Sequence, residues 1–538
     1  MRLGHRSTLS AAIAALMLVV ACGGPPPGDD AERLVVIGPD EDLAATIAGL
    51  EPGVIAVLED ATYELPDTLV ITADREIRGS GGTVLRTASV APSAGGASTA
   101  ASDVPEAFGQ PVVYADGISL VVRDMVIEHG GAVDGAVVVL VDSNASLSGV
   151  TLRDGTSGTF DLRRGHGVLV IGGDVLMASS LVEDNDAAGV AIVDGDGRLR
   201  VEQSTLRTNG WTGAFVNATA RLELVDVESL DNTWEGMIAR GDATLLVDGG
   251  RFASNGNHGI RVHAQASADV QGTVSEDNGV WGMLFHDQSQ AELRDVTVRG
   301  NVGSGIEIAG ESTVLLVNAS LTGNGVAGVA TVGAASLTAR DTIAANNDIG
   351  YYVTMTARAT IERGVARQNR LGIYVADDAA ATFTDIVVQD NGWVGAHVID
   401  AGSLTLRSAT FTDNTDHGVF VLGEAELVIE GGSYANAEQQ GVIVGGNATG
   451  TVDGATVETN GVHGILVVDE AITHVVDSTL RDNGIHGVVF EDASSGSVTT
   501  STLSGNGACG VYRNDPAAVE LSDNTFDDNA GPEVCQPN

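Results

Sequence analysis

Histidines recur at a fixed spacing near the C-terminal end of the chain, as His417, His463 and His486, and Cys509 follows at the same interval. Gln440 fills the remaining place in this series. Two imidazoles and a thiolate within reach of one another could bind Cu or Zn. We favour the other interpretation, in which the histidines form a polar row and the cysteine enters a disulfide, so no metal is predicted. Either interpretation requires the chain to repeat its path once per interval, so that these side chains lie next to one another.

A second series carries aromatic side chains suited to binding sugars. Tyr352, Tyr374 and His397 follow one another at a similar interval, and Trp393 stands shortly before His397. Aromatic faces stack against the apolar faces of sugar rings, and an exposed apolar row often marks a binding site. We therefore take these four residues as candidates for substrate binding. The alternative is that loops or a partner cover the row and that tyrosine merely suits β-strands.

An asparagine that recurs every 22 to 24 residues sets the interval for both series. Repetition at such a period predicts a stacked solenoid, in which equivalent residues of successive turns lie about 4.8 Å apart. We expect the asparagines to form a hydrogen-bonded ladder along the stack. They are Asn185, Asn209, Asn232, Asn255, Asn278, Asn301, Asn324, Asn346, Asn391, Asn414, Asn436, Asn460, Asn483, Asn506 and Asn529, with Gln368 or Asn369 in one vacancy.

The residues that follow each asparagine indicate a β-strand. The fourth is nearly always glycine, where we expect a sharp turn, and the fifth and seventh are apolar, as in Gly259, Ile260 and Val262. An alternation of period two places both apolar residues in the interior and the sixth residue outside. The outward positions include Phe215, Arg261, Glu307, Tyr352, Tyr374, His397, Phe420 and Tyr512.

The segment before the repeats predicts a cap. Residues 42–50 place Leu43, Ile47 and Leu50 on one helical face, and Pro52-Gly53 ends the helix before strand-like segments begin. This order resembles the start of right-handed parallel β-helices of the pectin-lyase-like type, and the resemblance covers roughly residues 35 to 530. It implies an all-β, single-stranded parallel β-helix with about 22–24 residues per rung and a short N-terminal capping helix.

The enzymes of the pectin-lyase-like type, which the sequence resembles, mostly lyse, hydrolyse, esterify or epimerise polysaccharides. Gly165-His166-Gly167 matches one polygalacturonase element, but the acidic elements expected before it do not precede it. The arginine/lysine base pattern of the lyases is also incomplete, because all 27 basic residues are arginine. Since fold alone does not fix function, we expect a non-catalytic module that binds polysaccharide or a cell-surface partner. The alternatives are a polysaccharide lyase, hydrolase or epimerase, and a rigid structural or adhesive stalk.

The first residues indicate export. Residues 1–21 combine two arginines with a short apolar stretch, as in a signal peptide, and Val19 to Cys22 resemble the lipobox of bacterial lipoproteins. We expect a lipid on Cys22, a tether over 22–33, a cap over 34–66, the β-helix over 67–508 and a C-terminal coil and cap over 509–538. The lipid anchor would be the only membrane contact. It would hold the protein at the bacterial cell envelope, at the outer membrane or the cell surface.

Composition restricts the partners. A net charge of −45 argues against nucleic acid, since no basic surface is available to displace phosphate counterions. The same charge repels acidic polysaccharides unless divalent cations or local arginines intervene. We predict no cofactor but leave calcium open, and we expect a monomer. With Cys22 assigned to lipid, Cys509 and Cys535 remain about one rung apart, which predicts a disulfide in the last coil.

Overall fold

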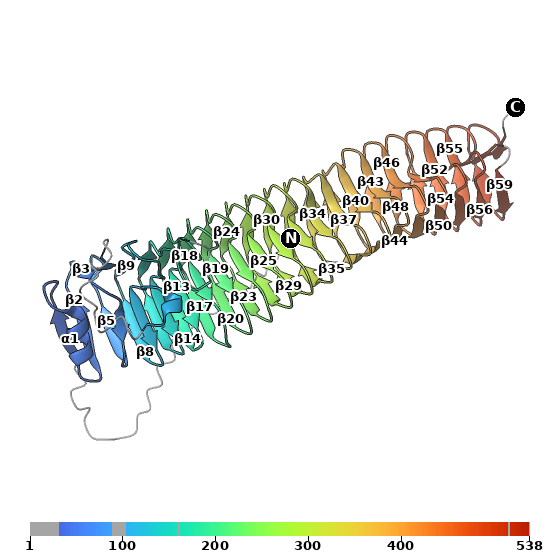
Figure 1. The fold of residues 1–538 in the computed structure, drawn as a ribbon. Helices are drawn as coiled ribbons and strands as arrows, with labels where there is room; N and C mark the ends of the chain where they lie inside the picture. The colour runs from blue at the N-terminus through green and yellow to red at the C-terminus, as the bar shows by residue number, and fades with distance from the viewer. Residues whose placement is uncertain (1–31, 89–103, 159–161, 515–516, 537–538) are drawn as a thin grey trace, which may run out of the picture.

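Three parallel β-sheets wind around one interior and give the molecule an elongated shape (Figure 1). The computed structural model describes residues 32–88, 104–158, 162–514 and 517–536. A typical turn has one strand in each of sheets C, A and B: β25 (Ile260–Val262), β26 (Ser267–Gln271) and β27 (Val274–Glu276). Each pairs in parallel with its counterpart of the next turn, so Ile260 lies beside Met283. The predicted all-β parallel β-helix is confirmed.

The N-terminal end begins with β1 (Arg33–Ile37), α1 (Leu43–Gly49) and β2 (Val54–Leu58). Asp42 accepts a hydrogen bond from the backbone N–H of Ala45 at 3.0 Å, and Leu43 and Ile47 of the helix are buried. At the other end, Cys509 is disulfide-bonded to Cys535 of β61 (Val534–Cys535). Within the described residues, no helix is long and apolar enough to cross a membrane. Cys22 and the predicted signal segment lie outside the described residues.

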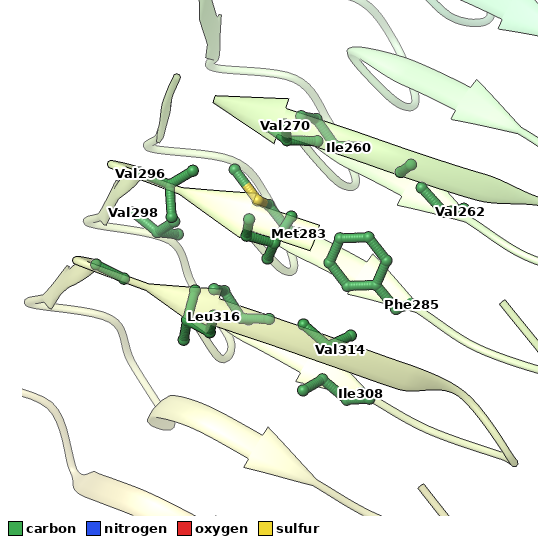
Figure 2. Packing of buried hydrophobic residues seen from close by; sticks show 14 of the residues in the cluster. Ile260, Val262, Val270, Met283, Phe285, Val296, Val298, Ile308, Val314 and Leu316 are labelled. Carbon is green, nitrogen blue, oxygen red and sulfur yellow. The ribbon is translucent and has the colours of Figure 1, made fainter. Parts of the chain in front are cut away.

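Apolar side chains from equivalent positions of successive turns stack in columns that fill the interior (Figure 2). Ile260 and Val262 of β25 point inward, and Met283 and Phe285 of β28 (Met283–Phe285) continue the same two columns; all four side chains are fully buried. Because the register places like positions one above another, each turn buries its apolar residues against those of its neighbours. The alternation of inward and outward residues along each strand therefore determines which side chains form the interior.

The asparagines form the expected ladder at the turn between sheets B and C. Asn255 donates through Nδ2 to Oδ1 of Asn278 at 3.0 Å, and Asn278 donates in the same way to Asn301 at 2.9 Å. The remaining amide hydrogen of Asn278 reaches the carbonyl of Phe252 at 3.1 Å, and Oδ1 of Asn278 also accepts from the backbone N–H of Asn255 at 3.1 Å. A buried amide that lost these partners would cost free energy, so the ladder specifies the turn.

Two ladder positions differ from the sequence prediction. Asn347, not Asn346, bonds to the ladder, through Asn369 at 3.2 Å, and Ala437 stands where Asn436 was expected. Asn346 and Asn436 both have a φ of 57°. The residue before each ladder position adopts this left-handed conformation, which asparagine tolerates better than most residues. Of the two adjacent residues at this turn, the first therefore adopts the left-handed conformation and the second takes the ladder position.

The glycine four places after the asparagine is required by close approach. A Cβ on Gly259 would lie 2.6 Å from the carbonyl oxygen of Gly282 and 2.9 Å from Nδ2 of Asn278. No side chain fits between these atoms. The glycine thus lets each turn pack directly on the ladder, which is a stronger reason for its recurrence than the sharpness of the turn.

Candidate functional site

The outward positions of sheet C form one continuous column along the molecule, here called the outer column. Its strands after β28 are β31 (Ile306–Ile308), β34 (Ala327–Thr331), β37 (Ile349–Val353), β40 (Leu371–Val375), β43 (Val394–Val398) and β46 (His417–Val421). Their paired outward residues, beginning at β25, are Arg261, Leu284, Glu307, Ala330, Tyr352, Tyr374, His397 and Phe420.

An aromatic region occupies the rungs from β37 to β46, and consists of Tyr352, Tyr374, Trp393, His397 and Phe420. The rings of Tyr352 and Tyr374 stack with centroids 5.3 Å apart, and those of His397 and Phe420 stack at 5.1 Å. Tyr374 and Trp393 each meet His397 edge-on, at 5.8 and 5.5 Å. The four residues proposed from the sequence therefore lie together, and Phe420 extends the row.

The aromatic region packs against apolar side chains and is bordered by an ion pair. Beside it lie the buried side chains Ala327, Ala330, Ile349, Leu371 and Val394. The guanidinium of Arg370 lies 5.6 Å from the centre of the Trp393 ring and pairs with Asp348 through Nε at 2.6 Å. Aromatic faces that are packed against apolar side chains and bordered by charges form a surface on which a ligand could stack and donate hydrogen bonds.

A charged region, absent from the sequence predictions as a unit, occupies the rungs around β25 and β28. The carboxylate of Glu235 is buried, and its Oε1 accepts from Nη1 of Arg261 at 3.4 Å. Nε of Arg261 donates to Nε2 of His286 at 3.1 Å, and Nδ1 of His286 lies 3.1 Å from Oδ1 of Asp287. Nδ1 of His263 lies 3.6 Å from the other oxygen of Asp287. Two imidazoles and a carboxylate thus meet at one point.

Burial changes the protonation of acids and bases in this region. It raises the pKa of the Glu235 carboxyl, and it raises the pKa of Glu307 to about 7. Burial together with the charge of Arg261 lowers the pKa of His258 to about 3. Such shifts are common where side chains transfer protons, although structural networks produce them too.

Two of the three groups in this cluster differ in the protonation that their surroundings favour. Burial, followed by the charge of Arg261, lowers the pKa of His263 to about 4, so its imidazole is neutral at pH 7. A hydrogen bond from the backbone N–H of Ala264 lowers the pKa of Asp287, which therefore stays ionised. One ligand atom each from His263, His286 and Asp287 lies within 4.8 Å of the others. The spacing of the two histidines, 23 residues, is the sequence signal that could have revealed this cluster.

The C-terminal histidine series stacks its histidines on neighbouring rungs, and its cysteine is in a disulfide. The rings of His463 and His486 stack 5.2 Å apart, as expected for neighbouring rungs. Cys509, however, is bonded to Cys535 and offers no thiolate. Its backbone N–H instead donates to Nδ1 of His486 at 3.1 Å.

Two other sequence features prove to be structural. Phe215 was predicted to face outward, and it does so, but it is fully buried under Trp211, whose ring lies 4.7 Å away. His166, of the polygalacturonase-like element, is also fully buried, and its Nδ1 accepts from the backbone N–H of Ala188 at 3.2 Å. His166 thus holds neighbouring backbone in place, and Phe215 packs against the ring of Trp211.

Comparison with known proteins adds the following. A family model described as "Right handed beta helix region" matches residues 135–321, 281–371 and 371–526. No curated protein matches the chain. Similar solved structures include the N-terminal fragment of bacteriophage Phi29 gene product 12, with 11% identity, a TM-score of 0.44, and coverage of 89% of this chain and 88% of that one. Another is the A-module of Azotobacter vinelandii mannuronan C-5 epimerase AlgE6, with 16% identity, a TM-score of 0.30, and coverage of 68% and 91%.

Proposed function

We propose, for a chain that belongs to the right-handed β-helix family, that the outer face of sheet C binds polysaccharide through its aromatic region. The observation that carries this proposal is the unbroken row of rings from Tyr352 to Phe420 on successive rungs. Three rung intervals make the row about 14 Å long, enough for a short run of sugar rings. Stacking on such a row would position a chain of sugars along the long axis of the molecule.

The surroundings of the row favour an uncharged ligand. Burial lowers the pKa of His397 and raises that of Tyr374, so both side chains are neutral at pH 7. The whole protein carries a charge of −45, which repels an acidic polymer unless calcium bridges the two. A neutral polysaccharide is therefore the ligand that best fits the aromatic region.

The location of the protein is part of the same proposal. Its support is the lipobox-like sequence ending at Cys22, from which a lipid would hold the chain at the bacterial cell envelope, at the outer membrane or cell surface. About twenty stacked turns span on the order of 100 Å. A monomer anchored at one end would thus present the aromatic region to a glycan well away from the lipid.

A polysaccharide lyase, hydrolase or epimerase is the second candidate, and the charged region is the observation that favours it. Glu235 and Arg261 lie on the same sheet face as the aromatic region, and the raised pKa of Glu235 suits a general acid. Product formation from a panel of polysaccharides, followed as unsaturated ends or reducing sugar, distinguishes this candidate. Loss of product in Glu235→Gln but not in Tyr374→Ala would assign the chemistry to the charged region.

A glycan array tests the binding proposal. Residues 30–538 are applied with and without calcium, together with a variant in which Tyr352, Tyr374 and His397 are replaced by Ala. We expect the wild type to bind a neutral or calcium-bridged polysaccharide and the variant to lose at least 10-fold in affinity, about 1.4 kcal/mol. Unchanged binding by the variant would refute the aromatic region as the site. No binding by either protein would favour a structural or adhesive stalk.

A further inference from the structure

We propose that His263, His286 and Asp287 form a binding site for a divalent transition metal ion of the zinc or copper class. The site lies where β25 and β28 leave sheet C, beside the outer column. It is separate from the aromatic region and does not depend on the proposed polysaccharide binding.

The backbone register brings the three side chains together. His263 and His286 each follow the last residue of a paired strand, and their rings stack with centroids 4.8 Å apart and planes within 7° of parallel. Asp287 places one oxygen 3.1 Å from Nδ1 of His286 and the other 3.6 Å from Nδ1 of His263. Ligands of one zinc ion bind at about 2.0–2.2 Å and so lie roughly 3–3.5 Å from one another. Small rotations of the two imidazoles would complete this geometry.

The carboxylate is held in place before any ion arrives. Asp287 adopts a left-handed backbone conformation, with a φ of 64°, in the turn between sheets C and A. Its Oδ2 accepts the backbone N–H of Ala264 at 3.0 Å. The two histidine side chains are 19% and 21% exposed, whereas that of Asp287 is 53% exposed. An ion would therefore enter from the solvent side and keep open positions there.

The donor set selects the class of ion. Two imidazole nitrogens and one carboxylate suit Zn, Co, Ni or Cu, whereas Ca and Mg prefer oxygen ligands throughout. A shallow hollow of about 320 Å³ borders Asp287 and is lined by Asp242, Gln265 and Gln288. Water or a small ligand could occupy the open coordination positions from this hollow.

Arg261 must change partners when the ion binds. Its Nε now donates to Nε2 of His286 at 3.1 Å. If Nδ1 of His286 binds the metal, the neutral imidazole carries its proton on Nε2, which then cannot accept from Arg261. Glu235 offers the alternative partner, because Nη1 of Arg261 already lies 3.4 Å from its Oε1 and its buried Oε2 has no hydrogen-bond partner among the described residues. Metal binding thus transfers the guanidinium from the histidine to the buried carboxylate.

The chain contains a matched control for this arrangement. His463 and His486 stack in the same way, at 5.2 Å and 14°, on the same sheet. Within the part of the chain that the structure describes, the group that gathers three suitable ligands is the His263 group and not this pair. A metal that merely requires two stacked histidines would bind at both places.

The test is titration of the metal-free full-length chain with Co²⁺ and Zn²⁺, followed by calorimetry and by the visible spectrum of cobalt. Excess Mg²⁺ suppresses weak binding to surface carboxylates. We expect one ion per chain, and a loss of affinity of at least 10-fold in His286→Gln and in Asp287→Asn. His463→Gln should bind as the wild type does. Absence of saturable binding, equal affinity in Asp287→Asn, or loss in His463→Gln would each overturn the proposal.

A second variant distinguishes a metal site from a merely structural cluster. Arg261→Gln removes a nearby positive charge that competes with the ion for His286. We expect this variant to bind Co²⁺ about 10-fold more tightly than the wild type, because no guanidinium has to be displaced. Weaker binding by Arg261→Gln would show that the arginine supports the cluster, and would contradict the exchange of partners.

Discussion

Two regions of one sheet face use the same backbone position for different chemistry. Around β25 and β31 the outer column carries Arg261 and Glu307, whereas from β37 to β46 it carries Tyr352, Tyr374 and His397. Parallel pairing between β31 and β34 and between β34 and β37 joins the two regions without a break. The scaffold thus fixes the spacing of side chains along the axis, while their identities decide whether a rung offers charges or stacking surfaces.

If both regions rest on the same asparagine ladder, removing one ladder amide from each region should cause a large loss of stability in both. Asn278→Ala and Asn347→Ala should each lower the free energy of unfolding by about 2–4 kcal/mol, since each leaves buried partners unsatisfied. Urea unfolding measures the loss. Asn346→Gly is the control, because glycine tolerates its positive φ and Asn346 does not belong to the ladder. Equal losses in Asn346→Gly and Asn347→Ala would contradict the assignment.

Two tryptophans, one in the aromatic region and one in the charged region, test whether the two regions differ in polysaccharide binding. Trp393 meets His397 in the aromatic region, whereas Trp281 stacks on His258 in the charged region at 4.8 Å. We expect Trp393→Ala to weaken polysaccharide binding about 10-fold and Trp281→Ala to leave it unchanged. Calorimetric titration with the glycan identified by the array provides the measurement. Equal losses in both variants would remove the distinction between the regions.

Glu307 offers a test that depends on pH. Burial raises its pKa from an ordinary value of 4.5 to about 7, so between these values the folded protein binds more protons than the unfolded chain. The contribution of this side chain to stability is therefore complete below pH 4.5 and is lost as the pH rises through 7. Glu307→Gln should be more stable than the wild type at pH 8, by on the order of 2 kcal/mol, and show a smaller gain at pH 5. Urea unfolding at both values would contradict this if the gain did not grow with pH.

A gap in the ladder borders the aromatic region and gives the smallest expected effect. Between Asn414 and Asn460 the ladder position is held by Ala437, whose backbone N–H still donates to Oδ1 of Asn460 at 3.0 Å. Ala437→Asn should restore the missing amide and raise the free energy of unfolding by about 0.5–1 kcal/mol. A loss of stability in urea would show instead that the side chains around Ala437 have filled the space.

The sequence predicts the fold almost completely because one repeated position determines each turn. The period of the asparagines and the alternation of residues such as Ile260 and Val262 are sufficient for the parallel β-helix. The ladder was misplaced at Asn346 because two adjacent asparagines compete for one site, and only the backbone φ decides between them. Local conformation, and not residue type, was the missing information.

The candidate sites were predictable to different degrees. Tyr352 and Tyr374 share one position of the repeat, so counting along the sequence brings them together. The charged region joins different positions of several turns: Arg261 reaches Glu235 of an earlier turn and His286 of the next. Such diagonal contacts depend on side-chain length and direction, which the repeat does not specify.

Radical footprinting of aromatic side chains, with and without bound polysaccharide, measures directly whether the ligand lies on the aromatic region. We expect the ligand to protect Tyr352, Tyr374 and Trp393 from oxidation and to leave Trp281 as reactive as before. Protection of Trp281 with no change at Tyr352, Tyr374 and Trp393 would place the ligand on the charged region and contradict binding by the aromatic region.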